Sequence, residues 1–155
     1  MRAILACAAL IVSTFIAGSA HASVGYSCGA KDSNVRLAIE AAYGTSLGGG
    51  AANFGGDIEI FVKDVPERLR RISLDLDHLG QNWFRGRDIK LVARWQAPEE
   101  EPFMEVTLIV EVRRGEAEES PYVGTYELWV DAAPSEDRTE WFRLETSGDA
   151  ACMIG

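Results

Sequence analysis

The stretch Met104-Glu105-Val106-Thr107-Leu108-Ile109-Val110-Glu111-Val112 decides the fold class of this chain. Every second side chain from Met104 to Val112 is apolar, and a β-strand turns alternate side chains to opposite faces. One face of the segment therefore packs on a core. The many β-branched side chains also fit a pleated, half-buried surface. The pattern predicts a long central strand.

The same alternation recurs on both sides of this segment. We expect further strands over residues 35–43, 58–62, 72–74, 89–95, 122–130 and 142–144. Residues 35–43 also fit a helix capped by Asn34, but their apolar odd-numbered row favours a strand. Proline, glycine and acidic residues fill the connecting stretches and end the strands.

Residues 75–84 follow a different spacing. Leu76, Leu79 and Trp83 recur at helical intervals, Asp75 can cap the first turn, and Gly86 lies just past the end. We expect one short helix that crosses between strands. About seven strands with one crossover helix predict a mainly antiparallel β-sandwich, with a partly closed barrel as the alternative.

The first 22 residues have the pattern of a signal peptide. Arg2 supplies a positive start, residues 3–17 are apolar, and Ala20-His21-Ala22 fits a signal peptidase site. The apolar run is shorter than the roughly 20 residues that span a bilayer. We expect an exported, periplasmic or secreted protein with a single domain over residues 23–155 and no membrane anchor after removal of the leader.

The cysteine count supports this expectation. The chain has three cysteines, and loss of the leader leaves Cys28 and Cys152. An even pair in an exported chain predicts a disulfide, which would close nearly the whole domain into one loop.

The charge balance limits the possible partners. The chain has 15 basic and 24 acidic residues among 155, a formal net charge of -9. This balance argues against nucleic acid, because affinity for phosphates needs clustered lysine and arginine. It favours a cationic partner through electrostatic steering.

Motifs for cofactors and catalysis are weak in this sequence. His78 is the one histidine outside the leader, and a single histidine cannot form a zinc site without further ligands. The glycine-rich residues 44–56 lack the Gly-Lys-Ser/Thr ending of a phosphate-binding loop. We expect no cofactor. Asp57, Asp75 and Asp77 are weak candidate ligands for calcium.

The aromatic residues are the stronger binding candidates. Phe61, Ile109, Trp129 and Trp141 fall on the outward rows of their strands, and neighbouring strands would gather them into one patch ringed by Glu59, Glu111, Glu127 and Glu140. An apolar patch with a polar rim is typical of a binding surface. Alternatively, the helix with Trp83 covers this face and the tryptophans belong to a second core. Asn53 and Phe54 would lie at the tip of a recognition loop.

We therefore expect a binding or interaction module, not an enzyme, whose partner is a protein or a glycan. One alternative is a hydrolase that uses the pair Asp75 and Asp77 or the pair Asp57 and Glu59. The other is a structural subunit of a cell-envelope assembly, joined through an exposed strand edge.

Overall fold

The protein is all-β. A computed structural model describes residues 24–43, 51–117, 120–134 and 139–155, so the expected leader lies outside the described residues. These residues form nine strands and two single turns of 3₁₀ helix. The elements are β1 (Val24–Lys31), β2 (Val35–Tyr43), β3 (Ala51–Ile60), η1 (Glu67–Leu69), β4 (Arg71–Leu74), η2 (Leu76–His78), β5 (Leu79–Arg85), β6 (Asp88–Gln96), β7 (Met104–Arg114), β8 (Tyr122–Ala132) and β9 (Phe142–Ile154).

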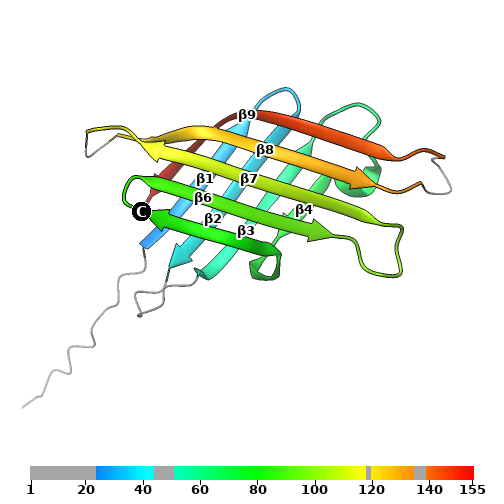
Figure 1. Cartoon of the computed structure of the whole chain (residues 1–155), viewed down its shortest axis with the longest axis horizontal. Helices are drawn as coiled ribbons and strands as arrows, with labels where there is room; N and C mark the ends of the chain where they lie inside the picture. Colours follow the sequence, from blue (N-terminus) through cyan, green and yellow to red (C-terminus); the bar gives the residue numbers. More distant parts are fainter. Residues whose placement is uncertain (1–23, 44–50, 118–119, 135–138) are drawn as a thin grey trace, which may run out of the picture.

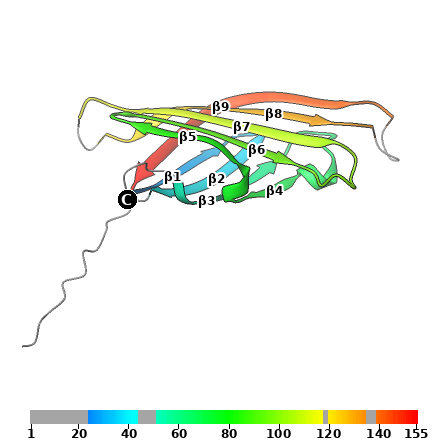
Figure 2. The same ribbon diagram turned by 60° about the horizontal axis from the view of Figure 1, so that its bottom comes forward.

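All nine strands belong to one antiparallel sheet, in the order β4-β3-β2-β1-β9-β8-β7-β6-β5. The sheet folds back on itself as a flattened, nearly closed barrel, with β5–β9 in one layer and β1–β4 crossing behind it (Figures 1 and 2). The end strands β4 and β5 do not pair with each other, so the barrel stays open between them. The structure thus fits the alternative prediction of a partly closed barrel. Its described residues form nine strands, more than the seven or so that we expected.

The two layers join at a short seam between β1 and β9. The long strand β9 pairs with β8 from Phe142 to Cys152, whereas only Ala151–Ile154 pair with β1. Cys28 and Cys152 face each other at this seam, with Cα atoms 4.0 Å apart, and form the disulfide that the sequence predicts. The bridge closes a sequence separation of 124 residues and fastens the seam covalently.

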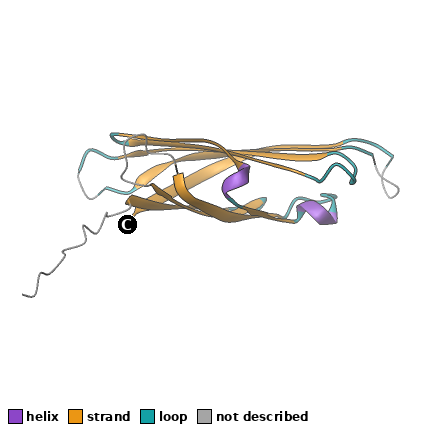
Figure 3. Ribbon diagram, turned by 90° about the horizontal axis from the view of Figure 1, so that it is seen from below, coloured by secondary structure: helices purple, strands orange, loops and turns teal. Residues whose placement is uncertain are grey.

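The edge-on view in Figure 3 shows the two layers of strands, and the side chains of the core pack between them. The inward row of β7 that decided the fold class is buried from Met104 to Val112, and it is flanked by the inward rows of β6 and β8. The opposite layer contributes inward rows from β2 and β3. The fully buried side chains include Val35, Ile39, Ile58, Ile60, Leu91, Leu108, Tyr126 and Leu128.

The prediction of a helix over residues 75–84 is wrong beyond the first turn. Asp75 does cap η2, where its side chain accepts a hydrogen bond from the Asp77 amide at 3.0 Å. The chain then turns into β5, because Gly86, at φ 62°, and Arg87 make a two-residue turn that pairs Arg85 with Asp88. Neither helical turn in the described part of the chain is long and apolar enough to cross a membrane.

Candidate binding face

Exposed aromatic side chains lie on the outer face of β7–β9. Trp129 of β8 stands between Thr107 of β7 and Glu145 of β9, and 40% of its surface is exposed. Thr107 is buried although it belongs to the outward row. The indole therefore rests on the sheet and presents its remaining surface to solvent.

A pair of aromatic rings lies where the β6–β7 and β8–β9 connections come together. Phe103 precedes β7 and Trp141 precedes β9, and their ring centroids are 6.0 Å apart at an interplanar angle of 53°. The Arg143 guanidinium lies 5.9 Å from the Trp141 ring centroid, a cation–π contact. We call Phe103, Trp129 and Trp141 the aromatic strip.

The structure brings together only part of the predicted patch. Ile109 lies on the outer face of β7, opposite Glu127, but it is half-buried. Phe61 is 48% exposed, yet it follows β3 in the other layer, where its amide donates to the Asn34 carbonyl. Its predicted outward direction fits, but β2, β1 and β9 separate β3 from β8, so Phe61 lies outside the aromatic strip. Phe103 belongs to the aromatic strip instead of Phe61. The sequence could have indicated this, because the odd-numbered position of Phe103 continues the outward row of the β7 segment.

The predicted recognition-loop tip is wrong for Phe54. Asn53 and Phe54 both belong to β3. Phe54 lies opposite Ala41 and is 3% exposed, within the core. Asn53 lies opposite Ala42 and is exposed. The glycine-rich residues 44–50 lie outside the described residues.

The charges near the aromatic strip are partly paired. Arg143 contacts Asp131 at 3.2 Å, and Arg94 lies 3.8 Å from Glu105. Of the acids expected to ring the patch, Glu127 is exposed on β8, Glu140 is exposed beside Trp141, and Glu111 pairs with Lys90. Glu59 lies in the other layer with Phe61 and does not border the strip.

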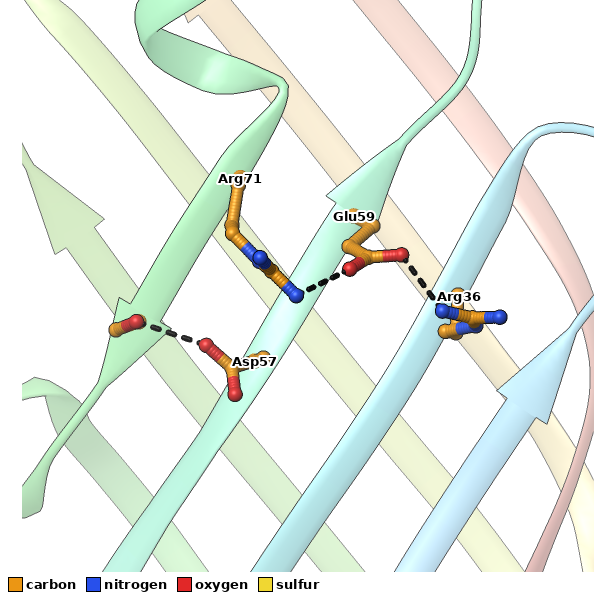
Figure 4. Close-up of polar contacts among 5 residues, drawn as sticks. Arg36, Asp57, Glu59 and Arg71 are labelled. Atoms are coloured by element: carbon orange, nitrogen blue, oxygen red, sulfur yellow. Dashed lines mark hydrogen bonds and ion pairs between the residues drawn. The ribbon is translucent and has the colours of Figure 1, made fainter.

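The acidic pairs considered for catalysis are engaged in local contacts. Glu59 bridges Arg36 at 3.0 Å and Arg71 at 2.6 Å across β2, β3 and β4, as Figure 4 shows. Asp57 accepts a hydrogen bond from the Ser73 hydroxyl at 2.8 Å (Figure 4). These contacts tie β3 to the strands on each side of it.

Asp75 and Asp77 lie at η2, where Asp75 also contacts His78. The His78 Nδ1 lies 3.1 Å from the Asp75 amide nitrogen and 2.7 Å from its Oδ1, which completes a capping box. No group of three or more histidine, cysteine, aspartate or glutamate side chains within the described ranges could hold a metal ion.

Buried polar groups brace the two layers from inside. The Tyr26 and Tyr43 hydroxyls both donate to Asn82 Oδ1, at 2.6 and 2.5 Å, so that β1 and β2 hold β5. Burial raises the pKa of both tyrosines, which keeps these hydroxyls protonated as donors.

A second brace joins Tyr126 of β8 to Asp32 in the β1–β2 turn. The Tyr126 hydroxyl donates to Asp32 Oδ2. Burial acts to raise the pKa of Asp32, but this bond and those from the Asn34 and Val35 amides together hold that pKa below its usual value.

The chain was also compared with known proteins. It matches no family model, no curated protein and no solved structure, so the support for a function comes from the geometry of the molecule itself.

Proposed function

We propose that this chain is an exported interaction module that binds a protein partner through the aromatic strip. One observation carries the proposal: Phe103, Trp129 and Trp141 are 48, 40 and 52% exposed on one outer face of the sheet. Exposed apolar side chains rimmed by charges are typical of interaction sites, and tryptophan is enriched among residues that dominate binding energy.

The detail of the strip favours a protein over a glycan. A sugar ring stacks on a flat, free indole face, whereas the Arg143 guanidinium already lies over Trp141. Phe103 is also tilted against Trp141 and does not extend it into a flat platform. Aromatic residues together with arginine are the composition found at the centres of protein interfaces.

The charge of the face supports a cationic partner. Glu127 and Glu145 flank the strip without an arginine or lysine partner in the described part of the chain, and the whole chain carries a formal charge of -9. This field would steer a basic protein toward the strip and raise the association rate, more strongly at low salt.

The test compares variants that remove equally exposed rings from different places. The chain without its leader is immobilised and offered an exported protein fraction and a glycan array, and the captured protein is purified for affinity measurement. Trp129→Ala with Trp141→Ala should weaken binding at least about tenfold. Phe61→Ala is the matched control, because Phe61 is 48% exposed in the other layer. It should bind as the wild type does.

Thermal unfolding of the same variants separates binding from folding. Because both tryptophans are substantially exposed, each change to alanine should cost about 1 kcal/mol or less. Capture that survives the double substitution, or retention on glycans alone, would contradict the proposal. A loss of several kcal/mol would mean that the rings are structural.

A further inference from the structure

The two end strands of the sheet differ in how well they are protected. β4 has only four residues, is bounded by η1 and η2, and carries Arg71, which pairs with Glu59. Short, charged edges resist pairing with other chains. β5 has seven residues with neither proline nor lysine, and Arg85 is its one charged residue. Within the described chain β5 pairs with β6 alone.

The β5 edge is exposed, and it is apolar toward its C-terminal end. Trp83 and Phe84 are 47 and 38% exposed, and β5 lies at the margin of its layer in Figure 2. After a register shift between Leu79 and Gln81, the strand pairs regularly as far as Arg85. In an antiparallel edge strand, alternate residues turn their N–H and C=O groups away from the partner strand. Such a row is a template for one more strand.

Contacts from inside the barrel hold this edge in place. Asn82 accepts both tyrosine hydroxyls, and the Phe84 ring lies between the rings of Tyr43 and Tyr122, at 6.2 and 6.4 Å. The strand is therefore fixed to the opposite layer before any partner arrives. A preorganised edge loses little conformational entropy on binding.

The charges at the two ends of the edge differ in sign. Asp77 lies just before β5, whereas Arg85 ends it and Arg87 follows in the turn, so one end of the edge is acidic and the other basic. Asp77 and Arg85 are exposed and have no ion-pair partner among the described residues. Antiparallel pairing about a two-fold axis places the acidic end of one copy beside the basic end of the other.

We propose that the β5 edge is a self-association site, at which two copies of this chain pair antiparallel and join their sheets. The overall negative charge does not prevent this, because salt screens repulsion beyond about 10 Å while the complementary ends lie in contact. The site is separate from the aromatic strip and does not depend on the proposed function.

The test is a charge swap followed by sedimentation velocity over concentrations up to about 1 mM, where weak specific association becomes visible. Arg85→Glu should raise the dimer dissociation constant at least about tenfold, because two acidic ends then meet. Asp77→Arg should also raise it, although this change reduces the net negative charge. The double variant D77R/R85E restores complementarity and should dimerise as the wild type does.

Two controls locate the interface. Lys63→Glu changes the net charge as much as Arg85→Glu but lies exposed beyond β3, and it should leave the dimer unchanged. Hydrogen exchange should show that the amides among residues 81–85 that face away from β6 become more protected as the protein concentration increases. The Trp129→Ala and Trp141→Ala variants should still dimerise. A monomer at every concentration, single variants that dimerise normally, or protection elsewhere would overturn the proposal.

Discussion

Removal of the Cys28–Cys152 disulfide should strongly destabilise this fold. The bridge closes 124 residues, and the chain-entropy relation for a loop of that length gives a stabilisation of about 5 kcal/mol at 25 °C. The structure adds a reason to expect the full effect. The bridge lies at the β1–β9 seam, where only four residue pairs hold the two layers in one sheet.

The measurement is thermal unfolding of the oxidised chain, the reduced chain and the variant C28A/C152A. Alanine suits both positions because the two cysteines are 4 and 1% exposed, and a hydroxyl there would be buried. For a domain of this size 5 kcal/mol corresponds to a fall in Tm of about 15–20 °C.

The reduced chain separates the effect of the cross-link from that of side-chain packing. It should melt close to the alanine variant, because both lose the same loop constraint. Equal Tm values for the oxidised and reduced chains would refute the reasoning. A fall confined to the alanine variant would mean that packing of the sulfur atoms, and not loop closure, stabilises the seam.

Two further predictions concern the core and its braces. In denaturant titrations, Tyr126→Phe should lower the free energy of unfolding by about 1 kcal/mol at pH 7 but by much less near pH 2. The lowered pKa of Asp32 gives stability that is present above its unfolded pKa of about 3.9 and is lost as pH falls through its folded pKa. An equal loss at both pH values would rule out a role for the carboxylate charge. Gly124→Ala should cost about 3 kcal/mol, because a Cβ at Gly124 would lie 2.0 Å from the Glu111 carbonyl oxygen and 2.8 Å from the Val112 Cα. Gly29→Ala, whose Cβ would meet nothing closer than 3.5 Å, is the control and should change stability by less than about 1 kcal/mol in the same denaturant assay.

Local alternation predicted much of the fold because side-chain period depends only on neighbouring residues. The apolar row of β7, the outward positions of Trp129 and Trp141, and the choice of a strand over a helix for β2 all follow from it. Phe61 marks the limit. Its outward direction could be predicted, but its distance from Trp129 depends on which strands become neighbours, and that order is set by the long-range pairing of β1 with β9.

The errors arose where two local signals competed. Leu76, Leu79 and Trp83 have helical spacing, yet the turn at Gly86 pairs Leu79–Arg85 with β6. Glycine, asparagine and aromatic side chains also favour helix only weakly. Phe54 stands among glycines that suggest a loop, but pairing with β2 turns it into the core. β1 contains two glycines and little alternation, and it forms because β2 and β9 flank it.

The seam between β1 and β9 has a mechanical consequence. Gly25 and Gly155 exchange backbone hydrogen bonds, so the first described strand and the last residue leave the barrel side by side. A pulling force applied through these two ends would separate only the few residues that lie outside the disulfide. The disulfide would then carry the force. The span between the two cysteines, which contains all of the buried core except Tyr26, would remain without tension. The domain should therefore extend little under force while oxidised and unfold only after reduction.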